Sequence, residues 1–179
     1  MPDGVRSELA RSVTFRESVR PSDREWVLRI VGSSGFFSEQ ETAVAAELVE
    51  EAALRGKASG YSFLFAERGR EVLGYTCFGP IACTRSSFDL YWIAVLPEIR
   101  GMGLGRKLLR RSESLICAAG GTRIYVETSS RPLYEPTRIF YEHNGYRKEA
   151  VLPDFYAPDD HKIVYVKGLD ESNPCSSTR

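Results

Sequence analysis

A glycine-rich stretch in the middle of the chain has the composition of a phosphate-binding turn. Glycines alternate at Gly101, Gly103 and Gly105, after an apolar run and before a run typical of a helix. The first turn of a helix has unpaired backbone N–H groups and the positive end of the dipole, which together favour an anion. Glycine lacks the Cβ that would keep a phosphate away from the backbone. A plain turn needs one glycine rather than three, so we favour phosphate binding. Positive charge nearby comes from Arg100, Arg106 and Lys107.

The spacing excludes two common phosphate-binding motifs. In a Walker A loop the lysine is followed by Ser or Thr, whereas Leu108 takes that place here. The dinucleotide fingerprint G-x-G-x-x-G fails as well, because its third glycine would fall at Arg106 or at Leu108. Glu127 lies about twenty residues further on, where a ribose-binding acid would stand. A dinucleotide-binding protein is therefore kept as the weaker alternative.

The pattern that remains, [QR]-x-x-G-x-[GA], fits Arg100–Gly105 and extends on both sides. The run from Val95 through Pro97 to Leu109 is similar to V-x-P-x-x-R-G-x-G-[LI]-G-x-x-L-[LM] of the GNAT superfamily of N-acetyltransferases. In that family the turn binds the pyrophosphate of coenzyme A. The segment Arg138–Tyr146 resembles its second motif, a helix that ends in F-Y-E-x-x-G-[FY]. The resemblance implies acetyl-CoA as cosubstrate. It assigns to the cofactor site Ile93, Ala94, Val95, Arg100, Gly101, Met102, Gly103, Leu104, Gly105, Arg106 and Tyr141.

Acetylation of an amine needs a base, because an alkylamine with a pKa of about 10 is protonated at neutral pH and only the neutral form attacks a thioester. Glu127, near the end of the predicted strand 123–128, is our first candidate for that base, and a surface glutamate is the alternative. Asp89 is the second candidate, although an exposed strand acid is favoured there. The resemblance makes Tyr141 the acid that protonates the coenzyme A thiolate, rather than an aromatic residue of the core. It also implies an oxyanion donor, a backbone N–H near Val95.

The chain departs from the family in one segment. Many members have an asparagine where this sequence has Tyr134, and the stretch Thr128–Pro136 is longer than usual. The resemblance further implies that the acceptor lies between the first two helices and the loop of the last strands. Acidic residues in those regions suit a cationic amine, but any solvated surface also has them.

The elements that hold these residues follow from capping and turn residues. S-x-x-E capping boxes at Ser22 and Ser38 predict two helix starts, and Gly120-Gly121 stops the helix that follows the glycine turn. The expected order is strand, two helices, three strands, helix, strand, helix and two strands, with one parallel crossover through the helix after Gly105. The fold class is α/β of the α+β-like GNAT type. We expect a mixed, mostly antiparallel twisted sheet of about six to seven strands flanked by about four helices.

The composition fits one soluble domain of 179 residues, with 42% hydrophobic and 27% charged residues. Lys+Arg and Asp+Glu are both 24, which argues against nucleic acid as a partner. No apolar run approaches the roughly 20 residues of a membrane span, so no membrane is expected. We expect an acetyltransferase domain over 13–169, between a flexible N-terminus at 1–12 and a disordered tail at 170–179.

The cysteines and histidines give no metal-binding pattern. The four cysteines form no C-x-x-C pair and there are two histidines, so no metal is expected. Apolar neighbours around three of the cysteines favour reduced thiols. With no apolar leader segment at the N-terminus, this predicts a cytoplasmic protein.

These patterns predict an N-acetyltransferase that acts on a primary amine by direct attack in a ternary complex. A small amine, an amino acid, a peptide N-terminus and a protein lysine all remain open as acceptors. The alternative is a non-catalytic acyl-CoA-binding sensor on the same fold. The presence of both Glu127 and Tyr141 favours the enzyme. Assembly as a homodimer is left open.

Overall fold

The computed structural model describes residues 13–169. Within them, one compact unit holds residues 13–78 and 92–112, and a second holds residues 79–91 and 113–169. The predicted flexible segment 1–12 and disordered tail 170–179 lie outside the described residues. The predicted domain limits themselves remain a prediction.

Residues 13–169 contain seven strands and four α-helices in the order expected from the sequence. The helices are α2 (Asp23–Gly32), α3 (Glu39–Arg55), α4 (Leu104–Ala118) and α5 (Glu135–His143). The strands are β1 (Thr14–Arg16), β2 (Ser62–Arg68), β3 (Glu71–Pro80), β4 (Ser87–Val95), β5 (Arg123–Ser129), β6 (Arg147–Ala157) and β7 (Asp160–Gly168). The strand order is β1-β2-β3-β4-β5-β7-β6, and β4 and β5 pair in parallel, as the crossover through α4 requires. The predicted fold class is confirmed.

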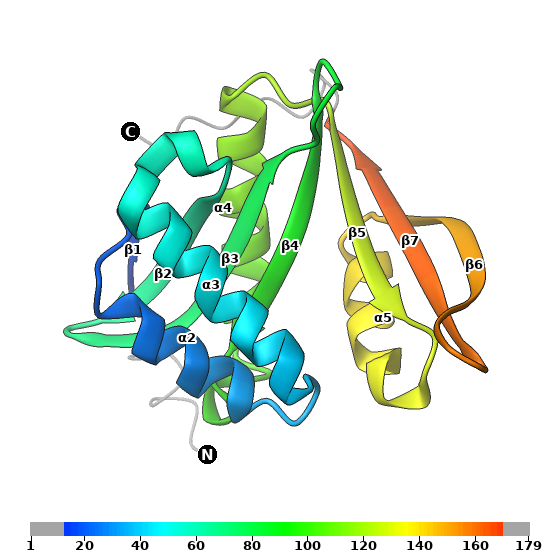
Figure 1. Ribbon diagram of the computed structural model, residues 1–179, viewed down its shortest axis with the longest axis horizontal. Coiled ribbons are helices and arrows are strands. Elements are labelled where there is room, and N and C mark those ends of the chain that lie inside the picture. Colours follow the sequence, from blue (N-terminus) through cyan, green and yellow to red (C-terminus); the bar gives the residue numbers. More distant parts are fainter. Residues whose placement is uncertain (1–12, 170–179) are drawn as a thin grey trace. The chain divides into compact units, whose positions relative to one another are not determined.

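In the first unit, β1, β2 and β3 pair antiparallel, with α2 and α3 side by side on one face and α4 on the other (Figure 1). The core on the strands includes the stacked rings of Phe63, Phe65 and Tyr75. On the other face, Thr76 of β3 and Ser112 of α4 share a buried hydrogen bond of 2.7 Å. Because the sheet is covered on both sides, most residues of β2 and β3 are buried.

One of the two predicted capping boxes is present. At the start of α3, the Ser38 hydroxyl accepts from the Glu41 N–H and the Glu41 carboxylate accepts from the Ser38 N–H. At the start of α2, Ser22 is the N-cap but its side chain makes no capping bond, so the prediction of a second box is wrong. The reason lies in the next residue. The Asp23 carboxylate accepts a hydrogen bond from the Arg20 N–H at 2.7 Å. This bond, rather than one from Ser22, stabilises the start of α2.

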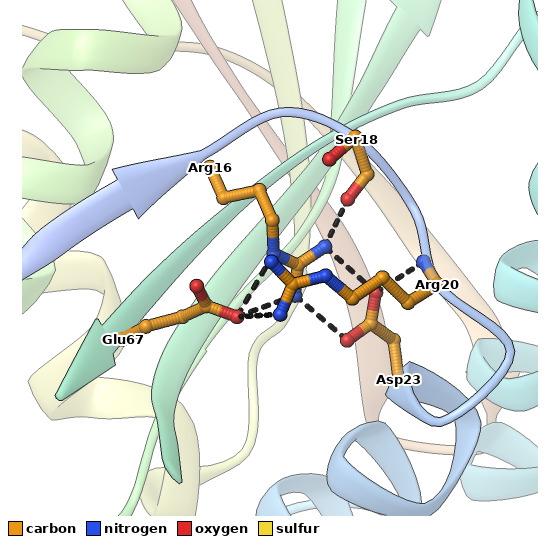
Figure 2. Close-up of polar contacts among 5 residues, drawn as sticks. All are labelled: Arg16, Ser18, Arg20, Asp23 and Glu67. Atoms are coloured by element: carbon orange, nitrogen blue, oxygen red, sulfur yellow. Dashed lines mark hydrogen bonds and ion pairs between the residues drawn. The ribbon is translucent and has the colours of Figure 1, made fainter. Parts of the chain in front are cut away.

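Asp23 belongs to a group of charges that we call the Arg16 cluster: Arg16, Arg20, Asp23 and Glu67 (Figure 2), in which all but Arg20 are largely buried. The Arg16 guanidinium donates to both Asp23 oxygens, at 2.9 and 2.8 Å, and to Glu67 Oε1 at 2.8 and 2.6 Å. It also lies over the Phe65 ring, 4.5 Å from its centre. The cluster therefore ties β1, the start of α2 and the end of β2 together.

In the second unit, β5 and β6 both pair antiparallel with β7, and α5 lies beside β5 and β7 (Figure 1). β6 is the last strand of the order and is almost wholly exposed. Its register with β7 shifts between Leu152 and Ala157, where Asp154 has a left-handed φ of 53°. The Asp154 N–H donates to His161 Nδ1 at 2.9 Å.

Candidate active site

The glycine turn has the geometry expected of a phosphate-binding turn. After β4 ends at Val95, a 3-10 turn over Pro97–Ile99 leads to the glycines, and α4 begins at Leu104. Gly101 and Gly103 have φ values of +75° and +81°, a conformation that side chains disfavour. A Cβ placed on either would meet no atom within 4 Å, so the space beside the turn is open to a ligand. Open backbone at the start of a 15-residue helix suits a pyrophosphate.

The last residues of β4 are held against β3. A Cβ on Gly74 of β3 would lie 2.7 Å from Val95 Cγ1 and 2.8 Å from the Ala94 oxygen, so only glycine permits this approach. The Leu96 N–H also donates to the Leu73 oxygen at 2.9 Å. Ala94 is buried, whereas Ile93 and Val95 are partly exposed. The backbone predicted to contact the cofactor is thus rigidly placed within its own unit.

The basic residues of the turn divide into two groups. Arg106 and Lys107, in the first turn of α4, are exposed. Arg100 instead donates from its guanidinium to the Ser34 carbonyl at 3.1 Å, and lies over the Phe36 ring at 5.0 Å. Its side chain is therefore engaged with the loop between α2 and α3. The sequence predicted Arg100 as a cofactor residue but could not show this second contact.

A groove runs between α2 and α3, with a volume of about 510 Å³. Its apolar lining includes Leu28, Phe37 and Ala46, and its acidic side chains are Glu39, Glu47 and Glu50. Arg24 pairs with Glu50 across the groove. The groove accordingly combines apolar lining residues with an excess of carboxylates.

In the second unit, the structure brings together the two carboxylates predicted as base candidates. Asp89 of β4 lies opposite Tyr125 of β5 in the parallel ladder, and Glu127 follows on the same face two residues later. Lys162 of β7 joins them, with its Nζ 2.7 Å from Glu127 Oε2. The ammonium also lies over the Phe155 ring, 3.5 Å from its centre. We call Asp89, Glu127 and Lys162 the Asp89 cluster.

The two carboxylates have different environments. The pKa of Asp89 is raised to about 6, mainly by partial burial and also by the nearby charge of Glu127, while Lys162 acts in the opposite direction. The Glu127 side chain is 51% exposed and bound to Lys162. A general base works best when its pKa lies near the working pH, so this environment favours Asp89 over Glu127. Lys162 was missed in the sequence, where a lysine in a strand looks like an ordinary surface residue.

Tyr141 lies on the buried face of α5. Its ring is 5.4 Å from that of Tyr146 and 6.1 Å from that of Tyr165, both centre to centre. Burial raises the pKa of Tyr141 above its ordinary value, so the hydroxyl keeps its proton at neutral pH. Such a group can donate a proton or a hydrogen bond but cannot act as a base. The predicted role as an acid is compatible with this state and remains a prediction.

The segment that departs from the family pattern is well tied to its surroundings. Residues Pro132–Tyr134 form a 3-10 turn, and Tyr134 is buried. Arg138 of α5 donates to the carbonyls of Ser129 and Arg131, at 2.8 and 3.0 Å. Tyr134, at the position where the family resemblance leads one to expect an asparagine, is thus part of the packing of this loop.

Three further features bear on the predictions. Among residues 13–169, no group of three or more His, Cys, Asp and Glu side chains is arranged to bind a metal ion. Within the same residues, Cys77, Cys83 and Cys117 form no disulfide. None of the helices described is both long enough and apolar enough to cross a membrane.

An open, mostly antiparallel sheet with a glycine-rich turn at the start of a helix is the fold of the acyltransferases of the GNAT type. The chain belongs to the GNAT family: the model for the acetyltransferase (GNAT) domain matches residues 59–148. A GNAT-family acetyltransferase from Desulfovibrio desulfuricans is 45% identical, covers 87% of this chain and 98% of its own, and superposes with a TM-score of 0.86. The protein is therefore an acetyltransferase.

More distant structures share the fold. An acetyltransferase from Salmonella typhimurium, solved with its cofactor acetyl-CoA, is 21% identical over 89% of this chain and 95% of its own, with a TM-score of 0.71. An aminoglycoside 6'-N-acetyltransferase complexed with coenzyme A is 21% identical over 87% of this chain and 96% of its own, with a TM-score of 0.69. No curated protein matches the chain.

Proposed function

We propose that this acetyltransferase uses acetyl-CoA to acetylate a primary amine by direct attack in a ternary complex. The observation that carries the proposal is the glycine turn. Gly101 and Gly103 leave open space beside the first turn of α4, where backbone N–H groups suit a pyrophosphate. Arg106, exposed in that turn, adds a positive charge. Binding of the pyrophosphate depends on the positive φ of Gly101 and Gly103, a conformation that a residue with a side chain would strain.

In this proposal the amine loses its proton to the Asp89 cluster. Asp89, with a pKa of about 6, is mostly ionised at pH 7 and is still basic enough to accept a proton. Glu127 keeps a negative charge nearby that raises the pKa of Asp89, and it can itself accept the proton if Lys162 releases it. Tyr141, which is protonated before the reaction, gives its proton to the departing thiolate and takes one back from solvent.

The groove between α2 and α3 supports a cationic acceptor. Three carboxylates, Glu39, Glu47 and Glu50, face one arginine there, Arg24. An acceptor with an apolar stem and a positive charge would match the apolar lining and the excess of acids. Small amines and the amines of peptides both have this character.

A thermal-shift panel of acetyl-CoA, coenzyme A, NAD and ATP tests the cofactor. We expect acetyl-CoA and coenzyme A to stabilise the protein by about 2.7 kcal/mol at a hundredfold excess over Kd, a rise in Tm of roughly 5–10 °C. In Gly103→Glu the shift should vanish, because the side chain and its negative charge occupy the phosphate site. The matched control is Gly69→Glu in the β2–β3 turn, where φ is also positive (+63°) and the surroundings are also open. A shift that persists in Gly103→Glu, or one caused by NAD alone, would refute the assignment.

Release of the coenzyme A thiol with a panel of primary amines then separates an enzyme from a sensor. An enzyme releases the thiol in proportion to amine added. A sensor on the same fold would show the thermal shift with no amine-dependent release.

A further inference from the structure

Arg100 joins two parts of the first unit that are far apart in the sequence. Its backbone begins the glycine turn, whereas its guanidinium donates to the Ser34 carbonyl and lies over the Phe36 ring. Ser34 and Phe36 belong to the segment 33–38, which we call the α2–α3 loop. One side chain thus links the predicted pyrophosphate site to this loop.

The α2–α3 loop has a defined internal structure. The Ser34 N–H donates to the Val31 carbonyl at 3.1 Å, and the Phe36 N–H donates to Ser34 Oγ at 3.1 Å. Gly35 is left-handed with a φ of +72°. Phe37 packs edge-on against Trp92 of β4, with ring centres 4.9 Å apart. Arg100 therefore contacts a loop that is held together by its own hydrogen bonds. A shift of the glycine turn would move such a loop as a unit.

The same loop contributes to the lining of the groove between α2 and α3. Phe37 lines the groove from within the loop, and the flanking residues Gly32 and Glu39 line it as well. A shift of the loop would therefore change the shape of the groove. All of these residues lie in the first unit.

We propose that Arg100 is a positioning residue that couples coenzyme A binding at the glycine turn to the α2–α3 loop and its groove. This inference rests on the proposed function. A phosphate that binds the backbone N–H groups after Gly103 fixes the turn, and with it the Cα of Arg100. The guanidinium then holds the Ser34 carbonyl by a hydrogen bond and Phe36 by stacking, two contacts that a lysine cannot reproduce together.

Hydrogen exchange with and without coenzyme A tests the coupling. In the wild-type protein, saturating coenzyme A should slow exchange at residues 101–106 and also at residues 33–37, with the Phe36 amide as the most direct reporter. Couplings between sites are typically about 5- to 150-fold, so we expect at least about fivefold at Phe36. In Arg100→Ala the slowing at 101–106 should remain and that at 33–37 should be lost. A purely structural role for Arg100 would alter exchange at 33–37 equally with and without the ligand.

Two further variants guard against a change in folding. Arg100→Lys keeps the charge but loses the stacking, and Phe36→Leu removes the ring from the other side, so both should weaken the slowing at 33–37. The matched control is Arg106→Ala, which should need more coenzyme A but show full slowing at 33–37 once saturated.

Each outcome has a distinct meaning. Slowing at 101–106 alone in the wild type, or equal slowing at 33–37 in Arg100→Ala, overturns the coupling and leaves the proposed function intact. No slowing at any residue with coenzyme A overturns both.

Discussion

Two groups of opposite charges in this protein differ in how completely their members are paired. In the Arg16 cluster, Asp23 is 1% exposed and accepts three hydrogen bonds, and Arg16 binds both acids (Figure 2). In the Asp89 cluster, Lys162 is bound to Glu127, and Asp89 is half-buried with only the charge of Lys162 to favour its ionised form. The first arrangement is complete, whereas the second leaves a carboxylate that can still take up a proton.

The difference appears in the pKa values. Burial lowers the pKa of Arg16, but its bonds to Asp23 and Glu67 outweigh burial and raise it overall. Burial raises the pKa of Asp89 to about 6, and the like charge of Glu127 acts in the same direction. A fully paired group thus keeps its charge and stabilises the fold. An incompletely paired carboxylate can take up and release a proton near neutral pH.

The largest effect is expected from breaking the Arg16 cluster. Arg16→Met keeps apolar contact with Phe65 but leaves Asp23 and Glu67 buried without their main partner. We expect a loss of about 3–5 kcal/mol in the free energy of unfolding, measured by urea denaturation. The control is Arg20→Ala, whose side chain is 55% exposed, with an expected loss below about 1 kcal/mol. Equal losses in the two variants would show that the buried pairs add nothing beyond a surface ion pair.

Removal of the Asp89 carboxylate should act on turnover. Asp89→Asn should lower kcat/KM at pH 7 by about a hundredfold, the low end for a general base. The measurement is the ratio of wild-type to variant kcat/KM from pH 5 to pH 9 with one identified acceptor. The ratio should be small at pH 5, where wild-type Asp89 is protonated, and rise through about pH 6. It should fall again toward pH 9, because more of the amine acceptor is then already neutral and needs a base less.

Glu127→Gln is the matched comparison for Asp89→Asn. If Asp89 is the base, kcat/KM of Glu127→Gln should still rise with pH, but the midpoint of the rise should move to lower pH. The reason is that the negative charge of Glu127, which raises the pKa of Asp89, is gone. If Glu127 is the base, Glu127→Gln costs more at pH 7 than at pH 9, and Asp89→Asn has little effect.

The smallest effect is on stability at the same site. The pKa of Asp89 is higher in the folded protein than in the unfolded chain, so its ionisation opposes folding, and stability falls as the pH rises through about 6. Asp89→Asn should therefore be more stable than the wild type at pH 7, by about 1 kcal/mol after allowance for partial exposure. At pH 4 the advantage should disappear because Asp89 is then protonated. Urea denaturation at both pH values measures this, and a variant that is less stable at pH 7 contradicts it.

The sequence predicts the elements well because their limits depend on local chemistry. The Ser38–Glu41 capping box, the glycines of the turn and Gly120-Gly121 act over a few residues, so their positions can be found without the rest of the chain. The missing box at Ser22 shows the limit of this reasoning. There Asp23 is engaged by Arg16 and by the Arg20 backbone, and the contact with Arg16 depends on the folded arrangement of β1 and α2.

The site is predictable only in part, for the same reason. The glycine motif is local, and the structure shows the open, left-handed turn that it implies. The choice between Asp89 and Glu127 depends on burial and on Lys162, which come from three strands and cannot be judged from spacing. The contact of Arg100 with Ser34 spans 66 residues and leaves no pattern in the sequence.

β6 has a consequence for how the protein behaves in concentrated solution. As the last strand of the order it offers an edge for pairing with another chain, and it exposes Val151, Leu152, Phe155 and Tyr156. Pro153 interrupts that apolar run, since it has no N–H to donate, and the left-handed Asp154 next to it gives its own N–H to His161. A strand from another molecule would find no continuous ladder there. The break therefore opposes the pairing of strands between molecules that begins aggregation, even though the edge is apolar.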